Sequence, residues 1–398
     1  MPSRSIRPRL PFSPATESRR HMSLFIGLMS GTSMDGVDAA LARIDADGIA
    51  TLGAAFLAFP PALRTELMAL QAAGSNEIER EALAANGLAR VYADCVTLLL
   101  EQSGQRHDAI CAVAVHGQTI RHRPELGFTR QTNNPALLAE LCGINVIADF
   151  RSRDVAAGGQ GAPLVPAFHH ALFSHPAQTR VVANIGGIAN ISILPGAGAD
   201  AGAGTRVRGF DTGPGNALLD GWIQRHLGRE YDQDGAWGAT GQLVPALLES
   251  LLREPYFALP APKSTGRDLF HMNWLEQHLS ACPAAASASP ADIQHTLAAL
   301  TAHTLAQAIR SDADGANASA VYVCGGGAYN ALLMQQLAVE LGPHTSVQST
   351  AALGVAPNHV EALAFAWLGQ RYTARLAGNL PAVTGAHGER ILGALYPA

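Results

Sequence analysis

The sequence predicts an α/β protein of two domains, each a mixed β-sheet flanked by helices, with a cleft for a ligand between them. Three observations predict this architecture. Strand-like segments that meander at the start of the chain are followed by alternating helical and strand-like segments, which is typical of a mixed sheet. The second half then repeats the opening unit of strand, glycine-containing loop and strand. A chain of 398 residues is long enough for two such domains.

The first domain is expected over residues 22–150. Apolar and alternating residues, separated by turn-forming sequences such as DADG, predict its strands. These strands are expected at residues 24–30, 37–44, 51–59, 111–117 and 144–150. Leucine and alanine at helical spacing predict helices at 61–72 and 77–102, and a further apolar helix precedes the last strand. The sequence HGQTIRHRP, at the end of the fourth strand, is expected to form a polar loop.

The second domain is expected over residues 151–356. Its opening strand segment, VVANIGGIANISIL at 181–194, is interrupted by Gly186 and Gly187, and TRVRGFD then leads the chain back. The small-residue turn between these segments, at 196–204, has the composition of a flexible hairpin tip. We therefore assign it no phosphate-binding role.

Two later segments and the N-terminus complete the predicted organisation. Residues 321–337 have the pattern of a strand, a triple glycine and a helix. A strongly apolar helix at 358–372 belongs to a C-terminal segment, 357–398, that is expected to return to the first domain. The arginine-rich residues 1–21 have no apolar run and so are not expected to form a signal peptide. They are expected to be a disordered tail before Met22, the expected natural start.

Composition argues against several classes of protein. Apolar residues make up 48% of the chain and charged residues 15%, which is typical of a globular α/β enzyme. A net charge of −5 argues against nucleic acid or an anionic membrane as a partner. The chain has no run of about eighteen apolar residues, so no membrane span is expected. The five cysteines form no CxxC pair, which favours buried thiols in a reducing compartment, so the expected location is the cytoplasm.

The segment LFIGLMSGTSMDGVDAAL predicts a nucleotide-phosphate loop between the first two strands. Glycine lacks the Cβ that keeps a ligand away from the backbone, so Gly31 and Gly36 allow close approach of a phosphate. Hydroxyl groups and backbone N–H groups in such a turn can surround an anion. Asp35 and Asp38 have the wrong charge for phosphate and instead suit a hydrated Mg²⁺. The predicted loop comprises Gly31, Thr32, Ser33, Met34, Asp35, Gly36, Val37 and Asp38.

Three other nucleotide or catalytic motifs fail on spacing. A P-loop requires GxxxxGK[ST], but the Lys–Ser pair at Lys263 is preceded by YFALPAP without a glycine. A Rossmann fingerprint requires GxGxxG, whereas GGGAYN has Asn330 in place of the third glycine. A serine-hydrolase elbow requires GxSxG, and the serine of GLMSG is displaced. The predicted nucleotide site therefore has no Walker lysine.

Asp211 is a candidate general base. It ends a strand in the sequence GFDTGPGN, where the following glycines and proline would hold a carboxylate at the edge of a cleft. Alternatively, Asp211 forms an Asx turn or caps a helix expected at 215–227, because aspartate favours both positions. The residues by themselves leave these alternatives open.

Together the motifs resemble the actin–hexokinase–Hsp70 superfamily and, within it, the anhydro-N-acetylmuramic acid kinase family. Two opposed hairpin loops and a third glycine turn form the pattern of a cleft that holds one nucleotide from both sides. Nine motifs run in order from Ile26 to Trp367 and cover nearly the whole chain: GLMSGTSMDGVDAAL, HGQTIRHRP, ADFRSRDVAAGGQGAPLVP, NIGGIANIS, GFDTGPGNALLD, DQDGAWGATG, PKSTGRDLF, CGGGAYN and PNHVEALAFAW.

The resemblance implies ATP and Mg²⁺ as cofactors. Phosphates would be held by the first loop and by Gly186 and Gly187, and adenosine would contact Gly325 and Gly326 in the CGGG turn. The implied activity opens the bridge of 1,6-anhydro-N-acetylmuramic acid and phosphorylates its O6 in cell-wall recycling. Asp211 would deprotonate a water that attacks the anomeric carbon opposite the leaving oxygen. The expected partners are these small molecules, and a homodimer is left open.

Four further residues have two open interpretations. Glu361, on the apolar C-terminal helix, either helps orient the attacking water or faces solvent near the start of that helix. Asp149, Arg151 and Arg153 follow a strand and either bind the lactyl carboxylate of the sugar or form a surface ion-pair cluster. Arginine favours the first interpretation, because its planar fork matches a carboxylate.

His116 and Gln118 are candidate sugar contacts, because they follow a strand in a segment where substrate contacts are common. Their spacing from His122 matches no zinc motif, so no metal-ligating set of residues is expected. Lys263 is the single lysine among 27 basic residues, and it is left between chance and a contact to phosphate or the sugar acid. The same fold would also suit another sugar or small-carboxylate kinase, or an actin-like assembly protein.

Overall fold

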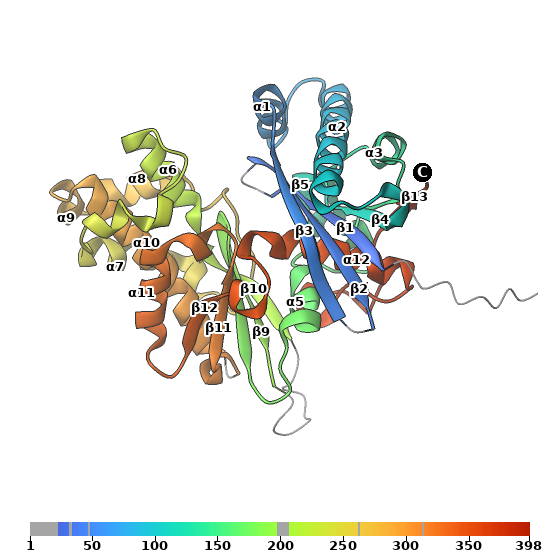
Figure 1. Ribbon diagram of the computed structural model, residues 1–398. Helices are drawn as coiled ribbons and strands as arrows, with labels where there is room; N and C mark the ends of the chain where they lie inside the picture. Colours follow the sequence, from blue (N-terminus) through green and yellow to red (C-terminus); the bar gives the residue numbers. More distant parts are fainter. Residues whose placement is uncertain (1–22, 32–33, 47, 197–206, 262, 313) are drawn as a thin grey trace, which may run out of the picture.

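The structure, a computed structural model, describes residues 23–31, 34–46, 48–196, 207–261, 263–312 and 314–398. It contains two large β-sheets, each flanked by helices, and these form the two halves of the molecule (Figure 1). The predicted α/β architecture with two mixed sheets is thereby confirmed. The expectations for residues 1–21 and Met22, for Thr32 and Ser33, and for the hairpin tip after residue 196 lie outside the described residues.

The first sheet has six strands in the order β13–β7–β4–β1–β2–β3. The first three strands along the chain form an antiparallel meander, whereas β4 and β7 run parallel to β1. The C-terminal strand β13 pairs antiparallel with β7, so the end of the chain returns to this sheet. The bounds are β1 (Leu24–Met29), β2 (Gly36–Asp45), β3 (Gly48–Ala58), β4 (Ile110–Val115), β7 (Val146–Ala148) and β13 (Ala394–Tyr396).

The second sheet repeats this arrangement with five strands in the order β10–β9–β8–β11–β12. Its first three strands are again antiparallel, and β11 and β12 continue parallel to β8. If the strands of each sheet are numbered along the chain, both sheets contain the order third, second, first, fourth, fifth. The predicted repeat therefore extends beyond the opening unit. The bounds are β8 (Arg180–Ile185), β9 (Ile188–Leu194), β10 (Arg208–Pro214), β11 (Ala320–Cys324) and β12 (Ser346–Ser349).

Helices cover both faces of the first sheet, because successive strand residues point to opposite sides. Phe25 packs in the cluster that contains α12 (Val360–Thr373), whereas its neighbour Ile26 packs in the cluster that contains α2 (Glu77–Ser103). At Gly27 a Cβ would lie 1.8 Å from the Ala362 carbonyl oxygen, so α12 crosses directly over β1. The shorter helices on the α2 side are α1 (Pro61–Ala69) and α3 (Pro135–Cys142).

Helix α2 is long and apolar enough, by length and composition, to cross a membrane. However, 56% of its most apolar window is buried inside the protein, and ten of its residues are buried in all. Its apolar side packs on β2 and β3 of the first sheet. Such burial is typical of a helix in the core of a globular domain.

Two helices fill the space between the sheets. Helix α12 packs on the first sheet, and α5 (Val165–Phe173) packs on α12 and on strands β8 and β9 of the second sheet. One hydrophobic cluster therefore runs from Phe25 through Phe168 and Trp367 to Val182. Because this core is continuous, the positions of the two sheets are linked by packed side chains.

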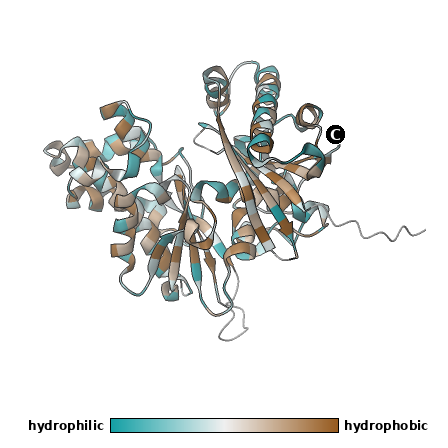
Figure 2. Ribbon diagram, in the orientation of Figure 1, coloured by the Kyte–Doolittle hydropathy of each residue, from teal (hydrophilic) through white to brown (hydrophobic). Residues whose placement is uncertain are grey.

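The second domain carries additional helices beyond its sheet, which Figure 1 shows as a group of short helices around α10. Their bounds are α6 (Asn216–Leu227), α7 (Pro245–Leu252), α8 (Met272–Ala281), α9 (Pro283–Ala286), α10 (Pro290–Ser311) and α11 (Ala331–Leu341). Helix α10 starts with a capping box in which Ser289 and Asp292 bond each other's backbone N–H. The strands are coloured mostly as hydrophobic in Figure 2, whereas the outer helices have mixed faces.

The sequence HGQTIRHRP, expected as a polar loop, instead leads into a β-hairpin of β5 (Gln118–Arg123) and β6 (Phe128–Thr132). Arg121 forms an ion pair of 2.8 Å with Glu77, and Arg130 one of 2.7 Å with Glu81, both on α2. Ion pairs to α2 therefore accompany this hairpin, together with the burial of one apolar side chain, Ile120. Its polar residues show no apolar alternation, which is why the pattern predicted a loop.

Candidate active site

The first glycine loop leaves β1 at Ser30 and is tied to the segment that follows β4. Ser30 Oγ donates to the Gly117 carbonyl at 3.3 Å and accepts from the Tyr92 hydroxyl at 2.8 Å, since a serine has only one hydroxyl proton. In return, Gln118 Nε2 donates to the Gly31 carbonyl at 3.1 Å. The backbone from which the predicted phosphate loop starts is therefore held by side chains on three elements.

Two residues predicted for this loop have buried side chains. Met34 and Val37 are buried in the hydrophobic core of the first domain, so their side chains are not available to a nucleotide. Thr32 and Ser33 lie outside the described residues. The prediction for Met34 and Val37 did not consider the packing of the first sheet against its helices, which places both side chains in one hydrophobic cluster.

Gly36 has a structural role besides the predicted one. It is the first residue of β2, and a Cβ there would lie 2.4 Å from the Leu57 carbonyl oxygen of β3. The packing of two strands therefore already requires a glycine at this position. Gly31, Asp35 and Asp38 remain as the described loop residues with groups that can face a ligand.

Carboxylates from both domains lie near this loop. Burial, followed by the negative charges of Asp35 and Glu361, raises the pKa of Asp38 to about 7. Burial also raises the pKa of Asp220, on α6 of the other domain, to about 7, and Asp35 contributes to that shift. Asp220 is absent from the residues predicted from sequence. The signal that could have found it is a single carboxylate after the apolar residues of GNALLD.

The second glycine loop, between β8 and β9, is bonded to the start of α6. The Gly186 carbonyl accepts from the N–H of Asn216 at 2.8 Å, and the Gly187 carbonyl accepts from those of Gly215 and Ala217 at 2.9 and 3.1 Å. A Cβ on Gly215 would lie 2.3 Å from the Gly186 oxygen, so the close approach requires glycine there. At Gly186, however, a Cβ would meet nothing closer than 3.7 Å. No protein atom therefore fills the space where a side chain at Gly186 would begin.

The third glycine turn follows β11 and lies against the end of β8. Gly325 has a φ of +76°, and a Cβ there would lie 2.5 Å from Asn184 Oδ1. Gly327 packs on the Ile185 side chain, with a Cβ position only 2.4 Å away. At Gly326, in contrast, a Cβ would have only an ordinary contact at 3.4 Å. Gly325 and Gly327 thus serve the fold, and Gly326 leaves room for a ligand.

Asp211 lies in β10 at an irregularity of the pairing with β9. Its Oδ2 accepts hydrogen bonds from Ser264 Oγ at 2.8 Å and from the Thr265 N–H at 3.0 Å. The residue before α6 is Gly215, which makes no side-chain cap, so the helix-cap interpretation of Asp211 is wrong. Its partners belong to a distant segment of the chain, so an Asx turn does not account for it either.

The environment of Asp211 suits a base. Burial raises the pKa of its carboxyl group above the ordinary value, whereas the bonds from Thr265 and Ser264 lower it. A carboxylate that holds a proton more tightly than usual is a stronger base. The Tyr256 hydroxyl donates to the Asp211 carbonyl at 2.7 Å and fixes the backbone beneath this side chain.

Lys263 belongs to the support of Asp211. Its Nζ donates to the carbonyl groups of Tyr256 and Phe257 at 3.2 and 3.1 Å and lies 4.7 Å from the centre of the Tyr256 ring. Its own carbonyl accepts the Asp211 N–H at 3.1 Å. The single lysine therefore joins a turn to the strand that carries the candidate base.

Glu361 lies at the start of α12, between the two domains. Asn184 Nδ2, at the end of β8, donates to its Oε1 at 3.3 Å. Burial raises the pKa of Glu361, and the charge of Arg151 and the bond from Asn184 lower it. The interpretation that Glu361 simply faces solvent is wrong, because the second domain covers this carboxylate.

Arg151 is held by two hydrogen bonds. Its Nε donates to His116 Nε2 at 2.9 Å, and its Nη1 donates to the Gly161 carbonyl at 2.7 Å. His116 therefore carries its proton on Nδ1, and burial together with the Arg151 charge keeps its pKa well below the ordinary value. Burial lowers the pKa of Arg151 to about 10, so it stays charged at neutral pH. Among the described residues Arg151 has no ion pair within 4 Å, so it does not belong to a surface ion-pair cluster.

Buried polar atoms without partners surround Arg151. Within the described part of the chain, neither His116 Nδ1 nor Gln118 Oε1 has a hydrogen-bond partner. Such atoms are rare in folded proteins, and both of these keep their bonding capacity available for a ligand. Asp149, two residues before Arg151, has a φ of +59° and is exposed, a conformation that is uncommon for a non-glycine residue.

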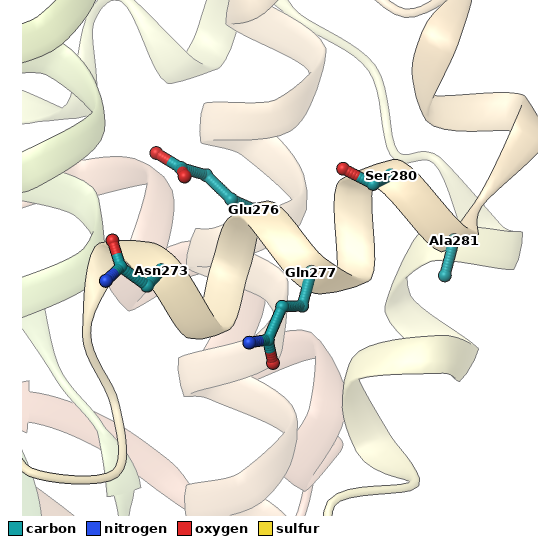
Figure 3. A pocket seen from close by; sticks show the side chains of 5 residues that line it. All are labelled: Asn273, Glu276, Gln277, Ser280 and Ala281. Carbon is teal, nitrogen blue, oxygen red and sulfur yellow. The ribbon is translucent and has the colours of Figure 1, made fainter.

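The structure thus brings the predicted residues together in two groups. One group lies where β4 and β7 end and α12 begins, and it contains Glu361, Arg151, His116 and Gln118. In the other group, Asp211 of β10 lies with Ser264 and Thr265. In the described part of the molecule no hydrogen bond joins Asp211 to Glu361. A separate surface depression lies along α8 and contains none of the predicted site residues (Figure 3). It is lined by Asn273, Glu276, Gln277, Ser280 and Ala281.

The two sheets share one strand order, and a glycine loop follows the first strand of each. This arrangement agrees with the predicted fold class, that of the actin–hexokinase–Hsp70 phosphotransferases. Comparison with known proteins then identifies the family. The sequence profile of anhydro-N-acetylmuramic acid kinase matches residues 23–398. The chain belongs to the anhydro-N-acetylmuramic acid kinase family.

Two curated relatives agree with this assignment. The chain is similar to the anhydro-N-acetylmuramic acid kinase of Cupriavidus pinatubonensis, with 58% identity over 94% of this chain and 98% of the relative. It is 56% identical to the one from Burkholderia orbicola, over 94% of this chain and 96% of the relative. Among solved structures, the activator of 2-hydroxyisocaproyl-CoA dehydratase from Clostridium difficile, with bound ADPNP, aligns with a TM-score of 0.46 and 13% identity, over 88% and 97% of the two chains.

Proposed function

We propose that this protein uses ATP to convert 1,6-anhydro-N-acetylmuramic acid to N-acetylmuramic acid 6-phosphate in the cytoplasm, as a step in recycling of the cell wall. The family assignment supports the substrate, and the five cysteines, all free in the structure, agree with a reducing compartment. The environment of Asp211 is the single observation that carries the chemistry, because it provides a partly buried carboxylate that is oriented by two donors and poised as a base.

In the proposed reaction Asp211 removes a proton from water as the water oxygen attacks the anomeric carbon. The bond from that carbon to the bridging oxygen breaks, and the freed O6 accepts the γ-phosphoryl group of ATP. Glu361 assists by orienting the water, which agrees with its burial between the domains and its bond from Asn184. Because these two carboxylates lie in separate groups, closure of the cleft around the substrates is part of the proposal.

The nucleotide is proposed to lie between the glycine loops. The open space at Gly186 and the room at Gly326 support contacts of phosphate and adenosine there, together with Gly31, Gly187 and Gly325. Catalysis of phosphoryl transfer relies mainly on positioning and on neutralising charge, both of which such loops and a metal ion supply.

Mg²⁺ fits the carboxylates beside the first loop. Burial, followed by the negative charges of Asp35 and Glu361, raises the pKa of Asp38 to about 7, so these carboxylates lie close enough together to hold one cation jointly. In the described part of the chain no three Asp, Glu, His or Cys side chains form a metal site by themselves. Mg²⁺ suits such a place, because it retains waters and uses one or two carboxylates along with phosphate oxygens. When bound, it would neutralise charge on the transferred phosphoryl group.

The sugar acid is proposed to bind at Arg151. Arg151 Nη2 has no hydrogen-bond partner in the described structure, and a planar guanidinium suits the lactyl carboxylate. The unpartnered polar atoms of His116 and Gln118 lie in the same group of residues and would bond the sugar, and Asp149 lies at its exposed edge. We further propose a division into a first domain of residues 22–150, a second of 151–356, and a C-terminal segment, 357–398, that belongs with the first.

A coupled assay of ADP release tests the proposal. Anhydro-N-acetylmuramic acid should support turnover, whereas glucose, N-acetylglucosamine and acetate should not. The Asp211→Asn variant should lose about a hundredfold or more in kcat, the range for removal of a general base, while binding ATP normally in calorimetry. Full turnover by this variant would remove Asp211 from the mechanism. Light scattering of the purified protein tests the homodimer left open by the sequence.

A further inference from the structure

The glycine-rich sequence DVAAGGQG, which follows Arg151 and Arg153, is folded around a fully buried carboxylate. Asp154 has no exposed surface. Its Oδ2 accepts the N–H of Gly161 at 2.8 Å, and a Cβ on Gly159 would lie 2.2 Å from the same oxygen. The loop therefore closes tightly on this side chain. Burial of a carboxylate is costly unless hydrogen bonds replace its lost hydration, so such a group calls for an explanation.

The C-terminal segment supplies the other hydrogen bonds. Asn379 Nδ2 and Thr384 Oγ1 donate to Asp154 Oδ1 at 2.7 and 2.8 Å. The Thr384 carbonyl in turn accepts the Gln160 N–H at 2.7 Å, and the His387 N–H bonds the Ala157 carbonyl at 2.8 Å. Residues more than two hundred positions apart in the sequence are thus joined at one carboxylate.

Gly161 connects this carboxylate to the proposed sugar site. The Gly161 N–H is bonded to Asp154, and its carbonyl accepts from Arg151 Nη1 at 2.7 Å. Gly161 has a φ of +68°, and a Cβ there would lie 2.7 Å from Val155 Cγ2, so this backbone conformation requires glycine. Arg151 is then bonded to His116 on its other side. The position of the guanidinium therefore depends on the backbone that Asp154 holds.

We propose that Asp154 is a positioning residue for the sugar acid: through Gly161 it fixes the Arg151 guanidinium, and the segment 379–384 is the support of that arrangement. This inference rests on the proposed role of Arg151 in binding the carboxylate of the substrate. A second effect acts in the same direction. Burial lowers the pKa of Arg151, whereas the negative charges of Glu361 and, to a smaller extent, Asp154 raise it, so Asp154 favours the charged form.

Three variants test this relay, the chain of contacts from Asp154 through Gly161 to Arg151, by steady-state kinetics. Asp154→Asn has the same shape but lacks the charge, and Thr384→Val removes one donor while leaving Asp154 in place. Arg151→Ala removes the proposed ligand of the sugar acid. We expect Asp154→Asn to raise KM for the anhydro sugar about tenfold and Thr384→Val about threefold, as for lost hydrogen bonds to a charged group, with KM for ATP unchanged. Asp154→Asn in the Arg151→Ala background should raise KM no further.

A purely structural role gives a different result. Partial unfolding lowers the concentration of active enzyme and therefore the apparent kcat, but it does not change KM for one substrate selectively. Thr350→Val is a matched control, because it removes a fully buried hydroxyl group that has no partner among the described residues. This control should leave both KM values unchanged.

The outcomes separate the inference from the proposed function. If Arg151→Ala raises KM for the sugar while Asp154→Asn and Thr384→Val do not, the relay through Asp154 is wrong and the assignment of Arg151 stands. If Arg151→Ala leaves that KM unchanged, the sugar-acid site is elsewhere and the relay is overturned with it. Should Asp154→Asn fail to fold, Thr384→Val decides: an unchanged sugar KM in that variant also overturns the inference.

Discussion

The side-chain amide of Asn184 donates a hydrogen bond of 3.3 Å to Glu361, and so joins the end of the first strand of the second sheet to the first turn of α12. The other end of the same amide faces Gly325, where a Cβ would lie 2.5 Å from Asn184 Oδ1. One side chain therefore touches both the third glycine turn and a candidate catalytic carboxylate. The two sheets meet at this point, and changes here should affect the chemistry more than the fold.

Asn184→Asp should shift the pH dependence of turnover. A second carboxylate beside Glu361 makes loss of its proton harder, because two nearby negative charges repel, so the acidic limb of the kcat profile should move to higher pH. We expect kcat at neutral pH to fall about tenfold. A profile from pH 5 to 9 measures this. Asn184→Ala, which only removes the bond, serves as the control, and an identical profile for both variants would contradict the charge argument.

Asp38→Asn should stabilise the free protein at high pH. A carboxyl group with a pKa of about 7 when folded and 3.8 when unfolded binds protons better in the folded state, so the free energy of unfolding falls as pH rises from about 4 to 7. The difference corresponds to at most about 4 kcal/mol. Thermal unfolding without nucleotide should therefore show a higher Tm for Asp38→Asn at pH 8, and a much smaller gain at pH 5. An equal gain at both pH values would argue against titration of Asp38.

Gly186→Ala separates the needs of a ligand from those of the fold. A methyl group at this position meets no atom of the protein closer than 3.7 Å, so Tm should stay within about 2 °C. If a phosphate occupies the open space, KM for ATP should rise about tenfold. Gly325→Ala is the matched contrast, because its φ of +76° and the clash with Asn184 should destabilise the protein by about 2 kcal/mol. Unchanged ATP kinetics in Gly186→Ala would place the phosphates elsewhere.

Lys263→Met should lower kcat indirectly, by loosening the backbone that supports Asp211. The ammonium group holds the carbonyl groups of Tyr256 and Phe257, so its loss should lower stability by about 1 kcal/mol and reduce kcat severalfold, with KM for ATP unchanged. Lys263→Arg, which keeps the charge and can contact the same ring, should retain most activity. An increase in KM for ATP in Lys263→Met would instead indicate a direct contact with phosphate, the alternative that the sequence left open.

Much of the architecture follows from local patterns. The meander of β1 to β3, the long helix α2 and the glycine interruption between β8 and β9 are visible in the sequence because apolar periodicity and glycine act within a few residues. The β5–β6 hairpin is the exception. It is accompanied by ion pairs such as Arg121 with Glu77, and such pairs join side chains that sequence periodicity does not relate.

The sequence by itself determined the two-domain α/β class, the glycine loops and the identity of Asp211, Glu361 and Arg151 as candidate site residues. The tertiary structure decided what each of them contacts: Asp211 with Ser264, Glu361 with Asn184, and Arg151 with His116. It also showed that Gly36 and Val37 serve packing, and it added Asp220 to the carboxylates near the first loop. The physical reason is that pairing of polar groups depends on how the sheets and helices pack, and that packing joins residues far apart in the chain.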